Sequence, residues 1–363
     1  MGNAKPIYDW LFVLFIHDTD GYQALWDNMV LDLERLGVGD NNCVIVIRET
    51  EELSVFQTIK ARGRILACFS HGAAFGINVD PQSDDILWVS DLVDILKQHL
   101  EESYIDLMVL NSCYMQNFDT GYLLKDVARY LVAAEGALHA AGFDYPALLS
   151  RINTDPAVTG AGLARAMITD CPGFYDRNNM DDNLEEQAVF AIDLFFYPLA
   201  LGLFKELLAL LSDNMAVIST DLLEIRETQI AYVSCPYLHY SNNYLHMIDA
   251  LQWAEMAIDK LLQRVPELMN GRGLQTRFYE WKSRFVIAGH VGQKLIAHDQ
   301  AKGIIKYGYS GISIFYPLKK DLAQLHSIPR LAYWGNRIKN DWQTKWVEFL
   351  QKMSECSRHQ GDL

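Results

Sequence analysis

The chain has 363 residues, half of them hydrophobic, and a formal net charge of −15. This length allows one large domain or two, and its 8 Trp, 18 Tyr and 16 Phe argue against disorder. The acidic charge disfavours binding to nucleic acid or to an anionic membrane and suits a basic partner or substrate. We therefore expect a folded monomer with no nucleic acid and no membrane partner.

The cysteines are widely spaced and form no Cys-x-x-Cys pair, which disfavours a zinc ribbon or a dithiol redox motif. They are Cys43, Cys68, Cys113, Cys171, Cys235 and Cys356. A reducing cytosol is the simplest interpretation. The first residues lack the apolar core of a signal peptide, and the longest apolar run, 195–211, is interrupted by Lys205 and Glu206. We predict a cytoplasmic protein, with a signal peptide removed ahead of the first residue as the open alternative.

Short apolar runs alternate with segments of helical periodicity in the first two thirds of the chain. The pattern predicts strands at 10–16, 43–48, 64–69, 107–110, 130–134 and 187–194. It predicts helices at 22–36, 51–62, 92–100, 123–131, 157–171 and 201–211, and loops over 73–85 and 173–183. This alternation favours an α/β fold with a mostly parallel sheet and helices on both faces.

The sequence pattern changes after about residue 225, where aromatic-rich helical segments dominate. These segments cover 244–265, 274–285 and 343–353, and a strand-like run at 311–316 stops before Pro317. We predict two domains, an α/β domain over 1–228 and a mainly helical subdomain over 229–363. One strand is expected to return near 311–317.

Two polar triplets follow predicted strands, Ser70–His71–Gly72 and Asn111–Ser112–Cys113. Chemistry in an open α/β sheet collects at the carboxyl ends of the strands. His71 precedes Cys113 by about 40 residues, close to the ~50 that separate His and Cys in caspases. A thiol assisted by an imidazole can attack a peptide carbonyl. Spacing alone leaves open a buried structural cysteine beside an unrelated strand-end histidine.

Several short blocks, in a fixed order over nearly the whole chain, carry a family resemblance. They are Ser70–His71–Gly72, Asn111–Ser112–Cys113–Tyr114–Met115, residues 122–135, Gly142–Phe143–Asp144–Tyr145, Ala191–Ile192–Asp193–Leu194 and residues 311–317. In sequence and order these blocks resemble those of the clostripain-like cysteine peptidases, distant relatives of caspases, gingipains and legumain.

The resemblance implies a caspase-like fold, a bacterial origin and cysteine endopeptidase activity on proteins or peptides. It assigns Cys113 as the nucleophile and His71 as the group that protonates the leaving amine. The backbone N–H groups of Gly72 and Cys113 would form the oxyanion hole. A side chain at Gly72 would crowd the approaching carbonyl, which fits glycine there.

The resemblance also indicates where substrate binds. The family has an Asp two places before the Cys, in a pocket that pairs with Arg or Lys, and this chain has Asn111 there. An amide can still accept hydrogen bonds from a guanidinium. Asp144, and less strongly Glu135, are candidates for a second acidic pocket residue, and Ser70 is a further substrate-binding candidate. We expect cleavage after Arg or Lys, with a neutral pocket as the alternative.

Many relatives mature by cutting themselves after a basic residue. Arg177, in the predicted loop 173–183, is the candidate for such a cut; the alternative is that no processing is needed. No cofactor is expected, although Asp84–Asp85 and Asp181–Asp182 could bind the calcium on which some relatives depend.

The sequence is also compatible with two other functions. The first is a catalytically silent caspase-like module that binds peptides or regulatory partners, which the missing pocket Asp favours and the retained His71 and Cys113 oppose. The second is an α/β hydrolase that uses Ser70 or Ser112, and the absence of a Gly-x-Ser-x-Gly elbow ranks it last.

Overall fold

The computed structural model describes residues 7–17, 22–72, 76–77, 86–228, 247–295, 309–316 and 341–359. The chain divides into two compact units. Unit 1 comprises Met1–Phe195, Tyr237–His239 and Val286–Ala297, and unit 2 comprises Phe196–Pro236, Tyr240–Phe285 and His298–Leu363. This division falls at Phe196 and not at the predicted residue 228, because the helices that follow Phe196 pack with the C-terminal helices.

Unit 1 is built on a seven-stranded sheet in the order β10-β8-β7-β6-β3-β1-β2. Its strands are β1 (Tyr8–Ile16), β2 (Asn42–Ile47), β3 (Ala61–Phe69), β6 (Ile105–Asn111), β7 (Ala128–Ala134), β8 (Ala188–Asp193) and β10 (Val286–Val291). Neighbouring strands from β2 to β7 are parallel, while β8 is antiparallel to both β7 and β10. The predicted mostly parallel sheet is confirmed.

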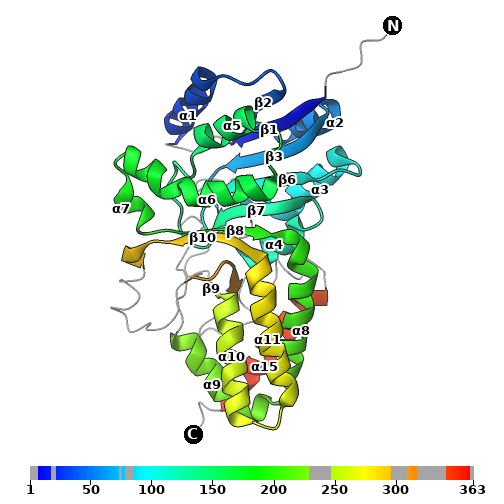
Figure 1. Ribbon diagram of the computed structural model, residues 1–363. Coiled ribbons are helices and arrows are strands. Elements are labelled where there is room, and N and C mark those ends of the chain that lie inside the picture. Colours follow the sequence, from blue (N-terminus) through cyan, green and yellow to red (C-terminus); the bar gives the residue numbers. More distant parts are fainter. Residues whose placement is uncertain are drawn as a thin grey trace. The chain divides into compact units, whose positions relative to one another are not determined.

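Helices cover both faces of this sheet (Figure 1). One face carries α1 (Gln23–Leu36), α5 (Tyr145–Thr154) and α6 (Gly160–Arg177), and the other carries α2 (Val55–Thr58), α3 (Val89–Leu100) and α4 (Phe118–Leu124). Short elements complete the unit: η1 (Thr50–Ser54), β4 (Gly76–Ile77), β5 (Leu87–Trp88), α7 (Asp181–Leu184) and η2 (Leu194–Phe196). Burial on both faces explains why β1, β3 and β6 read as continuous apolar runs.

The strand order changes direction between β1 and β3. From β1 the chain passes through α1 to the edge strand β2, returns across β1 to β3, and then continues to β6 and β7 on the other side. In open α/β sheets the crevice at the carboxyl ends of the strands beside such a switch point is the usual ligand site. His71 lies two residues beyond this end of β3.

Several elements of unit 1 differ from the sequence-based expectation. The predicted helix 123–131 is wrong, because α4 ends at Leu124 and the strand β7 begins at Ala128. The predicted loop 173–183 is wrong over its first half, because α6 continues to Arg177 with Pro172 inside it. Tyr175 is buried one helical turn after the buried Cys171, so the apolar stripe carries the helix past Pro172 and Gly173. The predicted helix 51–62 is also too long, since β3 already begins at Ala61.

Unit 2 is mainly helical. Its helices are α8 (Tyr197–Asp213), α9 (Met215–Thr228), α10 (Ala250–Arg264), α11 (Met269–Phe285) and α15 (Asp341–His359). The strand predicted near 311–317 is present as β11 (Ser313–Phe315), but it pairs with β9 (Met247–Asp249) in a small sheet of its own. Rings of Trp253, Trp346 and Phe349 pack with centroids 5.3–5.8 Å apart in the core of this unit.

One segment, Leu194–Asp213, has the length and composition of a membrane span. Core helices of soluble proteins pass the same test, and Leu203, Leu207 and Leu211 of this segment are buried within the protein.

Candidate active site

The two polar triplets lie at the ends of adjacent parallel strands. Phe69 pairs with Asn111, the last residues of β3 and β6, so His71 and Cys113 each lie two residues beyond a matched pair. Ser112 Oγ donates a hydrogen bond to the Ser70 carbonyl oxygen at 2.9 Å and ties the two ends together. The imidazole and the thiol therefore arise at the same edge of the sheet, and both residues are partly exposed.

Gly72 lies directly against the backbone of Cys113. A Cβ at Gly72 would be 2.3 Å from the Cys113 carbonyl oxygen, 2.8 Å from the Cys113 nitrogen and 2.8 Å from the Ser112 Cβ. Only glycine allows the two backbones to approach this closely. The main-chain groups of Gly72 and Cys113 are thus held side by side next to the thiol.

The thiol of Cys113 faces the main chain of Leu138. The Leu138 N–H donates to Sγ at 3.3 Å, and the Leu138 carbonyl oxygen lies 3.6 Å from Sγ, where the S–H can donate to it. Burial raises the pKa of the Cys113 thiol, and the Leu138 N–H opposes this shift because it stabilises the thiolate. The shift is upward on balance, because burial outweighs the hydrogen bond from Leu138.

A sharp turn follows Cys113. Tyr114 has φ 62°, a left-handed conformation that is uncommon for a bulky residue. Its N–H donates to the Gly136 carbonyl oxygen at 2.8 Å, and the Gln116 N–H donates to the Ala134 carbonyl oxygen at 2.9 Å. These bonds fix the turn to the end of β7 and offset the backbone strain at Tyr114. The chain therefore turns away directly after the thiol.

An aromatic ring packs against His71. The Tyr22 ring lies 5.3 Å from the His71 imidazole, centroid to centroid, and 5.9 Å from the Trp26 ring. His17, at the end of β1, donates its backbone N–H to the Phe69 carbonyl oxygen at 3.1 Å. Sequence reasoning did not identify Tyr22 or Trp26, because no spacing rule connects the start of α1 with the end of β3.

Ser70 and Asn111, two of the predicted substrate-binding residues, are the buried first residues of the two triplets. The Asn111 Nδ2 donates to the Ala140 carbonyl oxygen at 3.1 Å, and the Tyr145 hydroxyl donates to Asn111 Oδ1 at 3.2 Å. Both ends of the amide therefore have partners within the protein.

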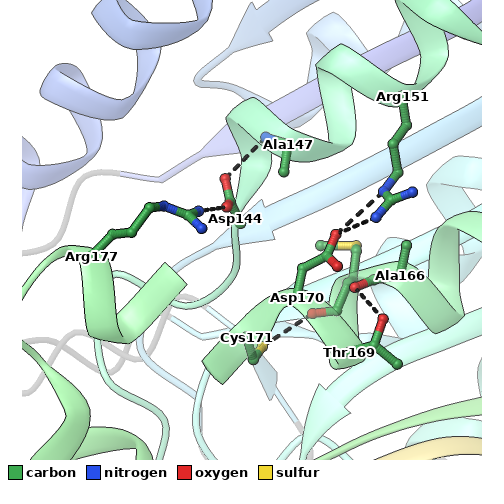
Figure 2. A network of polar contacts seen from close by, with 9 residues as sticks. Asp144, Ala147, Arg151, Ala166, Thr169, Asp170, Cys171 and Arg177 are labelled. Carbon is green, nitrogen blue, oxygen red and sulfur yellow. Dashed lines mark hydrogen bonds and ion pairs between the residues drawn. The ribbon is translucent and has the colours of Figure 1, made fainter. Parts of the chain in front are cut away.

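Asp144 and Arg177, predicted for separate roles, form an ion pair (Figure 2). Asp144 is the N-cap of α5, where Oδ1 accepts from the Ala147 N–H at 2.9 Å, while Oδ2 accepts from Arg177 Nη2. The Asp144 side chain is 5% exposed and that of Arg177 is 63% exposed. Glu135, the third acidic candidate, is fully buried just after β7.

Calcium binding at the paired acidic residues stays a prediction. Asp84–Asp85 lie outside the described residues, and Asp181–Asp182 begin the short helix α7. Within the described part of the chain, no group of three or more His, Cys, Asp or Glu side chains gathers as a metal site would require.

Comparison with known proteins identifies the family. The model of the clostripain family matches residues 53–357. Among curated protein sequences, none matches the chain. The fold is similar to that of an inactive zymogen C11 protease from Parabacteroides distasonis, with a TM-score of 0.59 and 13% identity over 93% of this chain and 98% of the other.

A second similar structure is a secreted C11 cysteine protease from Bacteroides thetaiotaomicron in complex with an irreversible peptide inhibitor. It has a TM-score of 0.57 and 13% identity over 93% of this chain and 99% of the other. The caspase-like fold predicted from the sequence is confirmed by these similarities. Since the family model covers most of its length, the chain belongs to the clostripain family and is a cysteine-type peptidase.

Proposed function

We propose that the chain is an endopeptidase in which Cys113 is the nucleophile and His71 is the general acid. The observation that carries this proposal is the register of β3 and β6, which brings the two residues to matched positions beyond adjacent strand ends. A thiol and an imidazole on one edge of a sheet are the groups that covalent hydrolysis of a peptide bond needs.

The reaction follows from these groups. The sulfur attacks the substrate carbonyl carbon and forms a C–S bond, while His71 takes up the thiol proton and the carbonyl oxygen becomes an oxyanion. The C–N bond then breaks as His71 gives the proton to the leaving amine. Water hydrolyses the remaining thioester and restores the thiol.

The oxyanion would be bound by the N–H groups of Gly72 and Cys113. The close approach of these two backbones supports the assignment, because an oxyanion hole needs two donors directed at one point. Gly72 also forms an isolated bridge with Ile77, which fixes the backbone on its other side.

Cleavage after Arg or Lys remains a prediction. Of the candidate carboxylates, Asp144 already holds a guanidinium, that of Arg177, whose side chain is largely exposed. A substrate Arg that replaced Arg177 would meet the same oxygen. Arg177→Gln should then raise kcat/KM for Arg and Lys substrates relative to neutral ones.

The neighbouring ion pair provides a matched control. Arg151 of α5 donates to Asp170 of α6 at 2.8 Å, between the same two helices (Figure 2). Arg151→Gln should leave the substrate preference unchanged. If both variants change the substrate preference equally, or if neither changes it, Asp144 does not bind the substrate side chain.

Self-cleavage at Arg177 also remains a prediction. Arg177 is the last residue of α6, so a peptidase must open the end of this helix and break the ion pair with Asp144 to reach it. Wild type and Cys113→Ala should be incubated side by side. A cut after Arg177 in wild type alone supports self-processing, and identical single bands remove it.

Action in a bacterial cytosol, as a monomer, is likewise a prediction.

The test of the proposed peptidase activity is a fluorogenic peptide panel that varies the residue before the cut, run with wild type, Cys113→Ala and His71→Ala. We expect turnover by wild type and a loss of turnover in both variants. Turnover that survives in Cys113→Ala would refute the proposal, and the absence of turnover in wild type would favour the catalytically silent module.

A further inference from the structure

Asn111 lies two residues before Cys113 and is sealed inside unit 1. It is the last residue of β6 and is only 3% exposed. Its Oδ1 accepts from the hydroxyl of Tyr145, which is itself fully buried at the start of α5. A substrate guanidinium would have to displace this phenol from the core before it could reach the amide oxygen.

The other end of the amide holds the chain segment that contacts the thiol, residues 136–142, here called the thiol-facing segment. Asn111 Nδ2 donates to the Ala140 carbonyl oxygen at 3.1 Å, and Trp26 Nε1 donates to the same oxygen at 3.0 Å. Gly142, with φ 63°, lies so close that a Cβ there would be 1.4 Å from Asn111 Oδ1. The end of the segment is therefore packed directly onto the Asn111 side chain.

The same segment reaches the nucleophile two residues before Ala140. The Leu138 N–H donates to Cys113 Sγ at 3.3 Å, and the Leu138 carbonyl oxygen lies 3.6 Å from Sγ. Asn111 and Cys113 are thus connected twice, through β6 and through the thiol-facing segment. A displacement of Ala140 moves the main chain that contacts the sulfur.

This arrangement suits an amide and disfavours an ionised carboxylate. An Asn can donate to Ala140 and accept from Tyr145 at the same time. An ionised Asp at this position would place a second acceptor against the Ala140 carbonyl oxygen and would bury a negative charge. The chemistry of the site therefore gives a physical reason why this chain has Asn at position 111.

We propose that Asn111 is a positioning residue that holds the thiol-facing segment against Cys113 through Ala140, and that it does not contact substrate. The proposal rests on the assignment of Cys113 as the nucleophile. Specificity for the residue before the cut then has to come from other side chains.

The test is Asn111→Asp, measured on substrates that differ only in the residue before the cut. The variant keeps the shape of the side chain and loses the donor. We expect kcat to fall by a common factor of about tenfold for Arg, Lys and neutral substrates, with KM and their ratios unchanged. A selective rise in kcat/KM for Arg and Lys substrates would overturn the proposal, as would an unchanged kcat.

Asn42→Asp is the matched control. Asn42 is also buried and donates its amide to a backbone carbonyl, that of Ile152, at 3.0 Å, but it lies on the edge strand β2. We expect the control to lose stability and to retain the wild-type kcat. An equal loss of kcat in the control would mean that the effect of Asn111→Asp is a general loss of folding, which would overturn the positioning role.

Two measurements keep the proposal testable if Asn111→Asp folds poorly or if wild type cleaves no peptide. Trp26→Phe removes the second donor to Ala140, and hydrogen exchange reports the Leu138 N–H without any turnover. We expect faster exchange of the Leu138 N–H in Trp26→Phe and in Asn111→Asp than in wild type. Unchanged exchange in both variants would overturn the proposal, whereas a wild type without peptidase activity would refute only the proposed function.

Discussion

Replacement of Gly72 by Ala tests the close approach of the two strand ends. The added Cβ would be 2.3 Å from the Cys113 carbonyl oxygen, whereas ordinary van der Waals contact begins at 3.4 Å. The two backbones must therefore separate by about 1 Å, and a displacement of that size at reacting groups can lower a rate by about 10²-fold. Overpacking of this kind also costs typically about 1–3 kcal/mol of stability.

The assay is kcat/KM on a fluorogenic peptide together with urea denaturation. We expect Gly72→Ala to lose about two orders of magnitude in kcat/KM and to shift the unfolding midpoint of unit 1 downward. Gly202→Ala is the matched control, because a Cβ on this residue of α8 would meet no atom within 4 Å. A helical Gly→Ala change there should stabilise the protein by roughly 0.5–1 kcal/mol.

A Gly72→Ala variant with wild-type kcat/KM and wild-type stability would refute this reasoning. It would mean that the strand ends lie farther apart in solution, and the pairing of Gly72 with Cys113 as an oxyanion hole would fall with it.

Three further predictions follow from the charges and the thiol. Because the Cys113 pKa is raised above its ordinary 9.0, its alkylation rate by iodoacetamide should still rise with pH above 9; a plateau near neutral pH would indicate a thiolate–imidazolium pair. Exchange of Arg177 for Gln should abolish any self-nicking that wild type shows, and a cut that persists at this place on a gel would remove Arg177 as the processing site. The hydrogen bonds from Arg264 lower the pKa of Asp221 from its ordinary 3.8. The pair therefore stabilises unit 2 fully above about pH 4, and this stabilisation is lost as the pH falls through the lowered pKa of Asp221. Asp221→Asn should therefore lower the urea midpoint at pH 7, and its difference from wild type should shrink below about pH 4; a constant difference would contradict the linkage.

Sequence patterns identified the strands that position the candidate site. β1, β3 and β6 are buried on both faces, so they appear as apolar runs that end where polar side chains begin. β10 was missed because its residues are only partly buried and include Gly289 and His290, which weakens any periodic signal. The predicted division at residue 228 followed a change in composition, whereas the packing of α8 and α9 decides where unit 2 begins.

Contacts around the thiol could not be predicted from the sequence. Asn111 forms hydrogen bonds with Ala140 and Tyr145, which lie 29 and 34 residues away in the sequence. No sequence motif predicts either contact. The resemblance placed Asn111 and Asp144 in a substrate pocket, but it could not show that the amide is engaged in the core or that Asp144 is paired with Arg177. Side-chain partners of this kind depend on tertiary packing.

The most direct test of the central claim is covalent capture by a peptide that carries an electrophilic ketone, read by tandem mass spectrometry. The account predicts a single adduct on the sulfur of Cys113, formed quickly in wild type, slowly in His71→Ala and not at all in Cys113→Ala. The buried thiols of Cys68 and Cys171, whose pKa values burial raises, should remain unmodified. An adduct on any other cysteine, or a rate that is the same without His71, would contradict the account.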